Sequence, residues 1–407
     1  MSRHIIIGNG VAGVTAAQSI VRADPAAEVL IFGAEPQPYY QRPRLWEFIA
    51  GQIETGALYF RPPEWYAARG IQVHLGAQVA ALDTAEHSLM LADGNSASYD
   101  RLLLATGARP FVPPFAGADK AGVFVLRTLD DAQAIRKRAQ DSSTAAVIGG
   151  GLLGLETARA LRTAGLEVTV IEFAPHLLPR QLDAEGAQVL QSLLQAQGMR
   201  ILTGAVIEAI LGDERATGVR LRDGALVDGE LVLISAGIRS RLELAREAGL
   251  EVNRGVVVDE HLRTGATDIY AAGDATEFEG VIYGIIPAAI QQAQVAAANM
   301  VTDGSATYNG TVPATTLKIA GIDLTSLGEA TATADEFVVL RDADPASGLY
   351  RRLTLRDGKI IGAILLGDRR NVQSLKQLIS AGRDVSAHSD RLLDQSFDLR
   401  ALAQDLS

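Results

Sequence analysis

Apolar and polar positions alternate in blocks along the first part of the chain, and the first blocks have the order of a βαβ unit. Residues 5–7 form a short apolar run, and a glycine pattern follows over residues 8–13. Residues 14–21 are rich in alanine with helical spacing, residues 29–32 form a second apolar run, and Glu35 follows shortly after. Short apolar runs on either side of a helical stretch indicate buried strands. The pattern predicts a strand, a helix and a second strand in succession.

The same order occurs a second time. Residues 145–148 are apolar, and a glycine pattern covers residues 149–154. A helical stretch at 156–163 and an apolar run at 168–171 follow, and Glu172 comes directly after that run. Two βαβ units in one chain predict an α/β fold with two parallel sheets.

Other segments complete this picture. Strands are expected at residues 102–105, 231–236 and 268–272, each followed by a glycine within two residues, and an Ala/Gln-rich helix is expected over 286–301. The Pro113–Pro114 pair is typical of a linker into the second unit.

The pattern of apolar and polar residues changes at about residue 313, where short segments of alternating apolar and polar residues indicate a small α+β domain. Its expected elements are strands at 315–319, 350–355 and 360–366, a hairpin turn at 356–359 and a helix at 372–381. We therefore expect three domains: residues 1–112 together with 241–312, residues 113–240, and residues 313–407.

Length and charge limit the function. A chain of 407 residues with 48% hydrophobic and 21% charged residues is globular and long enough for two or three domains. The net charge is −11. Nucleic acids and anionic membranes attract basic surfaces, so this charge argues against both as ligands. We expect a monomer or a homodimer.

The chain contains no cysteine, and its six histidines are scattered without metal-ligand spacing. Cysteine zinc sites, iron–sulfur clusters and redox-active thiol pairs are therefore excluded within this chain, and we expect no metal site. The apolar run near the start is too short for a secretory signal, so we expect a cytoplasmic protein.

The two glycine patterns suit dinucleotide binding. In G-x-G-x-x-G the first glycine makes the tight turn, the second lets the backbone approach a pyrophosphate, and the third lets helix and strand pack closely. An acid after the second strand binds ribose hydroxyls. Glu172 follows its strand directly and no arginine stands in the next five residues, so we expect NADH rather than NADPH at the second site.

Taken in order, residues 8–13, 40–43, 105–110, 149–156 and 270–274 resemble the pyridine-nucleotide-disulfide oxidoreductase superfamily. The resemblance implies a glutathione-reductase-like fold with two Rossmann-like domains. FAD would occupy the first domain, residues 1–112 with 241–312, and NADH the inserted domain, residues 113–240. It further implies that Asp274 binds the ribitol of FAD.

The cofactor-binding residues implied by this resemblance fall into two groups. Those for FAD are Gly8, Gly10, Ala12, Gly13, Ala34, Glu35, Arg42, Val79, Ala105, Thr106, Gly107, Arg109, Gly273, Asp274 and Ile286. Those for NADH are Gly149, Gly151, Leu152, Leu153, Gly154, Glu172, Ala236 and Gly237. Tyr39 and Tyr40 are expected either to pack a loop or to contact the flavin.

Within the superfamily, residues 42–47 and 317–323 resemble NADH:rubredoxin reductases and the flavoprotein module of NADH-nitrite reductases. Ferredoxin reductases of aromatic-ring oxygenases usually carry a lysine where this chain has Glu47. The resemblance pairs that position with Glu156 near the flavin. We expect Glu156 in the first turn of its helix, either as a partner of the helix dipole or, with Glu47, as a catalytic group that shares a proton.

The resemblance implies hydride transfer from NADH to FAD and electron delivery to a small acidic carrier of the rubredoxin or ferredoxin type. An NADH oxidase or diaphorase is one alternative, and a redox-gated flavoprotein that binds another protein is a second. Residues 351–383 carry six more positive than negative charges, which indicates either a solvated face or a docking patch for the carrier. The residues are Arg351, Arg352, Arg356, Lys359, Arg369, Arg370, Lys376 and Arg383 against Asp357 and Asp368.

Overall fold

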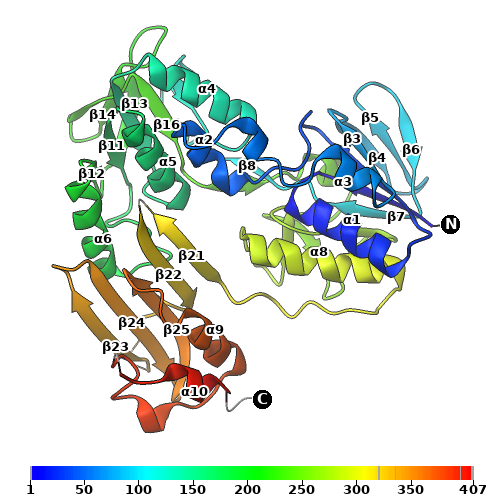
Figure 1. The fold of residues 1–407 in the computed structure, drawn as a ribbon. Coiled ribbons are helices and arrows are strands. Elements are labelled where there is room, and N and C mark those ends of the chain that lie inside the picture. Colours follow the sequence, from blue (N-terminus) through cyan, green and yellow to red (C-terminus); the bar gives the residue numbers. More distant parts are fainter. Residues whose placement is uncertain (1, 320, 335, 395, 405–407) are drawn as a thin grey trace. The chain divides into compact units, whose positions relative to one another are not determined.

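A computed structural model describes residues 2–319, 321–334, 336–394 and 396–404 (Figure 1). The chain divides into two compact units. Unit 1 is Met1–Arg44, Ile53–Pro110 and Ile238–Thr311, and unit 2 is Leu45–Gln52, Phe111–Gly237 and Val312–Ser407. Ala320, part of the rubredoxin-reductase-like segment, lies outside the described residues. The division into three domains stays a prediction, because the second and third expected domains share unit 2.

Unit 1 is built on a five-stranded parallel sheet in the order β19-β7-β1-β2-β3. Its strands are β1 (Arg3–Ile7), β2 (Glu28–Gly33), β3 (Ile71–Leu75), β7 (Arg101–Leu104) and β19 (Ile269–Ala271). Helices α1 (Val11–Ala23) and α8 (Ile286–Val301) pack along each other and contact this sheet, as Figure 1 shows. The short helix α3 (Pro63–Ala67) lies against β3.

Continuous apolar runs form these strands because both faces of a parallel sheet are covered. Ile6 is fully buried and pairs with Ile31 on one side and Leu103 on the other. A separate antiparallel sheet of β4 (Val79–Asp83), β5 (Ser88–Leu91) and β6 (Ser96–Ser98) completes the larger elements of the unit. Two short pairs join β8 (Ala108–Pro110) to β17 (Ile238–Ser240) and β18 (Val256–Val258) to β20 (Thr276–Phe278).

Unit 2 contains a second five-stranded parallel sheet, in the order β12-β11-β10-β16-β9. Its strands are β9 (Val123–Phe124), β10 (Thr144–Ile148), β11 (Glu167–Ile171), β12 (Arg200–Leu202) and β16 (Leu231–Ile234). Helices α4 (Leu129–Gln140), α5 (Leu152–Thr163) and α6 (Ala184–Ala196) pack with these strands, and α2 (Leu45–Ile49) packs on α4 and α5. An antiparallel sheet joins β13 (Ile207–Leu211), β14 (Gly218–Leu221) and β15 (Leu226–Asp228).

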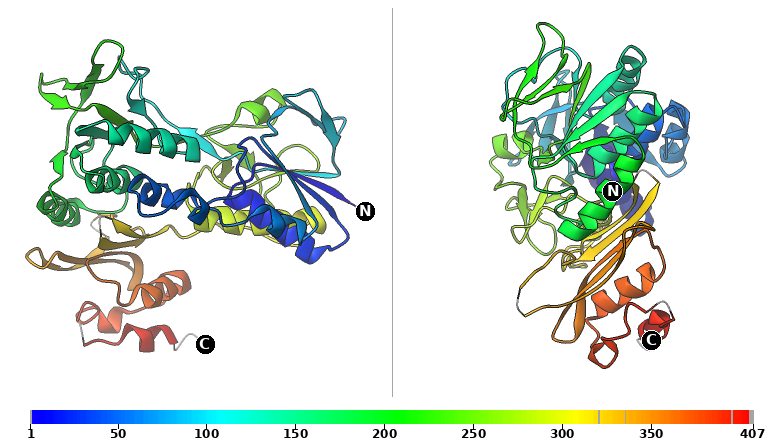
Figure 2. Two further views of the ribbon diagram at one scale, coloured as in Figure 1. Left: turned by 45° about the horizontal axis from the view of Figure 1, so that its top comes forward. Right: turned by 90° about the vertical axis from the view of Figure 1, so that its left-hand side faces the viewer.

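The rest of unit 2 is an antiparallel sheet in the order β21-β22-β25-β24-β23, with helices α9 and α10 beside it (Figure 2). The elements are β21 (Ala314–Ile319), β22 (Ile322–Gly328), β23 (Val338–Asp344), β24 (Leu349–Arg356), β25 (Lys359–Leu366), α9 (Val372–Ala381) and α10 (Leu399–Gln404). Leu353, Leu375 and Leu378 lie in its apolar core. The predicted fold class, two parallel α/β sheets and a small α+β part, is confirmed.

Two arginines of the basic segment lie inside the protein. Arg351 is 7% exposed and Arg352 is fully buried. The expectation of one solvated basic face is therefore wrong for these two residues. Both lie on β24, which pairs with β23 along one edge and with β25 along the other.

Asp183 balances the buried charge of Arg352. Its Oδ2 lies 3.4 Å from Arg352 Nη1 and accepts a 2.6 Å hydrogen bond from the Tyr350 hydroxyl. Its Oδ1 accepts from the Gly186 backbone N–H at 3.1 Å and so caps α6. One carboxylate thus ties β24 to α6.

We predict that Asp183→Ala lowers the free energy of unfolding by about 3–5 kcal/mol, because it leaves a buried guanidinium without its counter-charge. Thr128→Ala, which removes only the capping box of α4, should cost about 1 kcal/mol. Urea unfolding of the full chain measures both. Adding Arg352→Met to Asp183→Ala should recover part of the loss, and equal losses for the two single variants would contradict the prediction.

Candidate functional site: two nucleotide turns

The three glycines of the turn between β1 and α1 have two roles. A Cβ on Gly8 would lie 2.1 Å from the Ala105 carbonyl oxygen, and one on Gly13 would lie 1.9 Å from the Gly8 carbonyl oxygen. A Cβ on Gly10 would meet nothing within 4 Å. Gly8 and Gly13 therefore allow backbone to pack against backbone, while Gly10 leaves space open at the start of the helix.

The first turn of α1 is available to an anion. Gly10 caps the helix without a side chain, and no acidic residue stands in its first turn. Unpaired N–H groups and the positive end of the helix dipole therefore face the open space beside Gly10. Ala12 in this turn is buried, and its Cβ lies 3.1 Å from the position that a Cβ on Gly273 would take.

Glu35 follows β2 in a half-buried position with both carboxylate oxygens occupied. Tyr40 donates its hydroxyl to Oε2 and Arg42 donates Nη2 to Oε1, each at 2.5 Å. Arg42 is thus held beside the acid. Tyr40 is 4% exposed and binds Glu35, which supports its packing role. Ala34, next to Glu35, is exposed. Val79 is the first residue of β4 and lies close in sequence to Ala77, whose backbone N–H donates a hydrogen bond to the Gly33 carbonyl at the end of β2.

The carboxyl ends of β7 and β19 lie next to this turn, because these strands follow β1 in the sheet. The Thr106 hydroxyl donates a hydrogen bond to the Arg241 backbone carbonyl at 3.2 Å, and the Arg241 backbone N–H donates to the Gly107 carbonyl at 2.9 Å. The Gly273 N–H donates to Gln292 Oε1 at 2.8 Å, which joins the end of β19 to α8.

Three further predicted residues lie on the same unit. Asp274 is half-buried, and its backbone carbonyl accepts a hydrogen bond from the Ser240 hydroxyl at 2.6 Å. Ile286 begins α8 and is 43% exposed. Arg109 forms an exposed ion pair with Glu243 at 2.6 Å, so the structure gives its side chain a protein partner.

Asn9, between the first two glycines, is a residue that sequence reasoning missed. Its Oδ1 accepts a 2.9 Å hydrogen bond from the Tyr66 hydroxyl. Its Nδ2 is buried and has no hydrogen-bond partner among the described residues. A buried donor without a partner is costly, and a bound nucleotide would satisfy it. The motif treats this position as a spacer, so the pattern gave no signal.

The turn between β10 and α5 repeats the geometry of the first. A Cβ on Gly149 would lie 2.3 Å from the Ser235 carbonyl oxygen, and one on Gly154 would lie 2.0 Å from the Gly149 carbonyl oxygen. A Cβ on Gly151 would meet nothing within 4 Å. Half-buried Leu152 and Leu153 begin α5 after this turn, and Ala236 and Gly237 follow the end of β16 near Ser235.

Glu172 lies at the carboxyl end of β11 and faces the glycine turn. Its Oε2 accepts from the Gly150 N–H at 2.5 Å, and its Oε1 accepts from the Ala174 N–H at 2.7 Å. The next residue, Phe173, is 74% exposed, which makes it the most exposed of the large apolar side chains reported for the described residues. Sequence reasoning passed over Phe173, although an aromatic residue directly after the ribose acid was visible.

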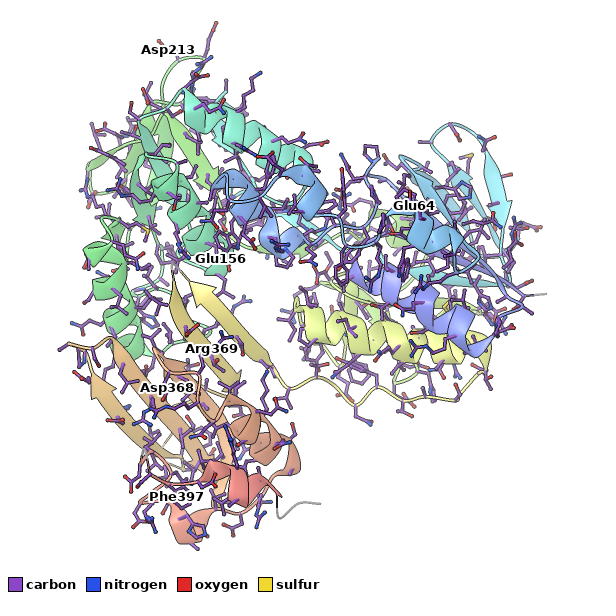
Figure 3. All side chains as sticks on the ribbon, in the orientation of Figure 1. Glu64, Glu156, Asp213, Asp368, Arg369 and Phe397 are labelled. Atoms are coloured by element: carbon purple, nitrogen blue, oxygen red, sulfur yellow. The ribbon has the colours of Figure 1, made fainter. Side chains whose placement is uncertain are left out.

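Glu47 and Glu156 belong to one helical cluster in unit 2. Glu47 lies on α2, which packs against α5 (Figure 3 labels Glu156 on α5). Burial, and then the charge of Glu47, raise the pKa of Glu156 to about 7. The expectation that Glu156 lies in the first turn is wrong, because α5 begins at Leu152 and its first turn holds no acid. The helix-dipole role therefore has no structural basis.

The residues of both turns fit the cofactors that the resemblance implies. Each turn has an open glycine position, free helix N–H groups and a fixed acid, and the first also has the unpaired Asn9 amide. FAD would be held by the first turn with Glu35 and the ends of β7 and β19. NADH would be held by the second turn with Glu172 and the end of β16.

No helix in the described ranges combines the length and the apolar character needed to cross a bilayer.

Two family models match the chain. The model of pyridine nucleotide-disulphide oxidoreductases matches residues 2–299, and the model of the rubredoxin NAD+ reductase C-terminal domain matches residues 313–383.

Individual proteins agree with these matches. A nitrite reductase [NAD(P)H] of Bacillus subtilis (strain 168) is 36% identical over 386 residues, which are 95% of this chain and 48% of that protein. The chain spans about half the length of several such curated relatives. An NADH oxidase of Methanocaldococcus jannaschii is 30% identical, with 95% of this chain and 92% of that protein covered.

Among solved structures, the covalent putidaredoxin reductase–putidaredoxin complex aligns over 99% of both chains, with a TM-score of 0.90 and 28% identity. The family resemblance predicted from the motifs is confirmed. The chain belongs to the pyridine nucleotide-disulphide oxidoreductase family, whose enzymes work with FAD and NAD(P)H.

Proposed function

We propose that this chain is an NADH-dependent FAD oxidoreductase that passes electrons to a rubredoxin-type iron-protein carrier. The observation that carries the proposal is the pair of matched nucleotide turns in a chain without cysteine. Two dinucleotides can bind, and no thiol pair within the chain can relay electrons between them and an acceptor. The match of residues 313–383 to a rubredoxin reductase domain favours an iron-protein acceptor.

FAD, when bound, supplies the chemistry that accepts a hydride and releases electrons singly or in pairs. The protein's own part is to bind and orient. The helix N-termini beside Gly10 and Gly151 bind the pyrophosphates, and Glu35 and Glu172 orient the riboses. Hydride transfer needs no acid–base triad, so positioning of the two cofactors is the main contribution of these residues.

Glu172 sets the choice of nicotinamide cofactor in this proposal. Both of its oxygens are fixed by backbone N–H groups, so its charge stays at the ribose position. A 2′-phosphate would bring negative charge against this carboxylate, whereas a 2′-hydroxyl can donate to it.

We predict that kcat/KM is at least about tenfold higher for NADH than for NADPH, because of this repulsion. Glu172→Gln should reduce the ratio, and Glu167→Gln, an exposed acid at the start of β11, should leave it unchanged. Dye reduction by the FAD-loaded protein measures both constants. Comparable values for the two cofactors in the unaltered protein would contradict the proposal.

We propose that Glu156, beside Glu47, is partly protonated at neutral pH. Burial makes ionisation of Glu156 costly, and the nearby charge of Glu47 adds to that cost. Their position near the flavin, which the family resemblance implies, stays a prediction.

This pair predicts a pH-dependent stability. The pKa of Glu156 rises from 4.5 to about 7 on folding, so the folded protein favours the protonated form. The resulting stabilisation is fully present below pH 4.5 and is lost as the pH rises through about 7. We expect a loss of about 1–3 kcal/mol between these limits. Urea unfolding of the wild type from pH 5 to 8 should show it.

Glu156→Gln should remove this part of the pH dependence, because the amide does not titrate. Glu167→Gln should keep it, since Glu167 is exposed. Identical pH profiles for the wild type and Glu156→Gln would show that Glu156 ionises normally.

An NADH oxidase is the second candidate, and the relative from Methanocaldococcus jannaschii favours it because nearly the whole of both chains aligns. The two candidates differ in the acceptor. An oxidase consumes NADH only with oxygen, whereas a carrier reductase turns over without it.

NADH consumption by the FAD-loaded protein, under argon and under air, with and without rubredoxin, separates them. We expect rubredoxin to raise the rate under argon by at least about a hundredfold, since the reduced cofactor then has an acceptor. A rate that depends on air alone, with no effect of rubredoxin, would overturn the proposal in favour of the oxidase. A protein that takes up no FAD would overturn both.

A further inference from the structure

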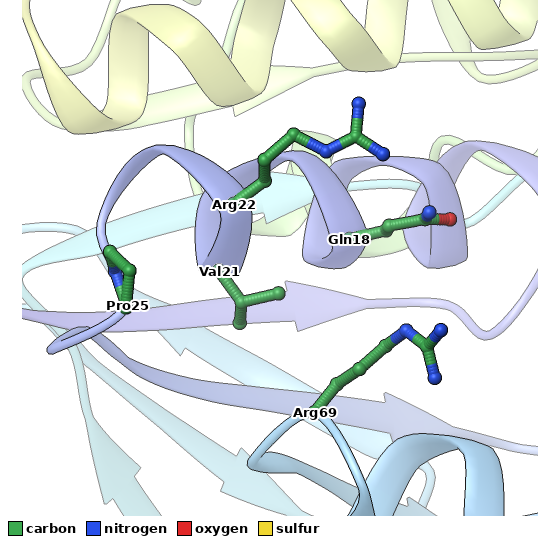
Figure 4. Close-up of a pocket in the computed structure, with 5 residues that line it drawn as sticks. All are labelled: Gln18, Val21, Arg22, Pro25 and Arg69. Atoms are coloured by element: carbon green, nitrogen blue, oxygen red, sulfur yellow. The ribbon is translucent and has the colours of Figure 1, made fainter.

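The outer side of α1 carries two adjoining hollows in unit 1. The first is lined by Gln18, Val21, Arg22, Pro25 and Arg69, which Figure 4 shows on α1, on the loop after it and on the turn after α3. The second also contains Gln18 and extends to Phe60, Arg61 and Ile286. We call the continuous surface defined by Gln18, Arg22, Arg61, Arg69, Phe60 and Ile286 the α1 groove.

Three arginines border the α1 groove without a carboxylate partner among the described residues: Arg22, Arg61 and Arg69. Arg61 lies over two aromatic rings, 4.0 Å from the Phe60 centroid and 4.8 Å from the Trp65 centroid. Arg69 lies 4.4 Å from the Trp65 centroid. Aromatic rings hold these guanidinium groups in place without neutralising them. The groove therefore presents fixed positive charge.

The acids near the α1 groove offset this charge only in part. Asp24, at the end of α1, accepts from the Ala26 N–H at 3.0 Å and from the Ser2 hydroxyl at 3.4 Å. These donors are neutral, so Asp24 keeps its negative charge, and Glu64, exposed on α3 as Figure 3 shows, adds a second. Two negative charges therefore stand against the three positive ones. The local balance is thus opposite to the net charge of −11 of the whole chain.

The arginines of residues 351–370 differ in this respect. Arg356 lies 3.8 Å from Glu329, Arg369 lies 3.6 Å from Asp323, and Arg370 lies 2.9 Å from Asp368. Arg351 and Arg352 are buried and pair with Asp342 and Asp183, respectively. Charges already paired with carboxylates attract an acidic partner weakly, so these five arginines contribute less to docking than their number suggests.

One end of the α1 groove reaches the elements assigned to FAD. Val11, which follows Gly10 in the first nucleotide turn, lines the second hollow together with Ile286, the first residue of α8. Phe60 is 46% exposed and Ile286 is 43% exposed, so this end has an apolar centre beside the arginines. Interfaces commonly place aromatic and apolar residues at the centre, with arginine among the strongest contributors.

We propose that the α1 groove is the docking surface for the small acidic iron-protein carrier, which places the metal of the carrier close to the first nucleotide turn. This inference rests on the proposed function. An acidic carrier is repelled by most of an acidic protein, so a local positive surface selects where it binds and raises the association rate. The exposed ring of Phe60 at the apolar end then supplies short-range contact.

The test is a double charge reversal, Arg22→Glu with Arg69→Glu, in the FAD-loaded full chain. Neither residue belongs to the nucleotide turns, so NADH-dependent ferricyanide reduction should stay unchanged. We expect kcat/KM for rubredoxin to fall by at least about tenfold at about 0.01 M ionic strength, because electrostatic steering is lost. The difference should shrink at about 1 M, where charges act over only about 3 Å.

The matched control is Arg222→Glu with Arg246→Glu, two exposed arginines that change the net charge equally. It should retain most of the rubredoxin activity, because the net change alone acts weakly. A third variant, Phe60→Ala, should lower rubredoxin reduction at both ionic strengths, since its contact is apolar.

If the unaltered protein reduces ferricyanide but not rubredoxin, the proposed function fails and the docking surface falls with it. If the unaltered protein reduces rubredoxin and the groove variant matches its control at every salt concentration, only the docking surface is overturned.

Discussion

The close approach of backbone to backbone at the two glycine turns is the constraint on which this structure depends. In each turn the third glycine of the pattern lies against the carbonyl of the first, at a distance that leaves no room for a Cβ. The first glycine lies equally close to a carbonyl at the end of a neighbouring strand, Ala105 in one sheet and Ser235 in the other. Helix and strand ends therefore converge, and the free N–H groups of the helix meet the carboxyl ends of the strands at one place.

That convergence also fixes which side chains can take part. β7 and β19 lie beside β1, so Thr106 and Gly273 reach the first turn although they are distant in sequence. Gln292 of α8 accepts from the Gly273 N–H, which ties a second helix to the same edge. The acids after β2 and β11 are each held through both carboxylate oxygens, so their position is set before any nucleotide binds.

The sequence predicted these elements well, because buried parallel strands and amphipathic helices have distinct periods. Residues 5–7 and 145–148, for example, are strands that end at the expected glycines. It could not predict the surroundings of single charges. Arg352 is buried because Asp183 of α6 meets it, and no local pattern links the two. The raised pKa of Glu156 depends on burial and on Glu47 of another helix, and Asn9 occupies a position that the motif leaves open.

Charge counting along the chain has the same limit, and the arginines show why. Residues 351–383 are the most basic segment by sequence, yet five of their arginines lie beside carboxylates from other segments or from a neighbouring turn. Arg22, Arg61 and Arg69 are scattered in sequence, so no window marks them. The fold brings them to one side of α1, where aromatic rings rather than acids hold two of them. The electrostatic field at the surface where a partner binds is set by the charges that have no opposite charge beside them, and the tertiary structure determines which charges those are.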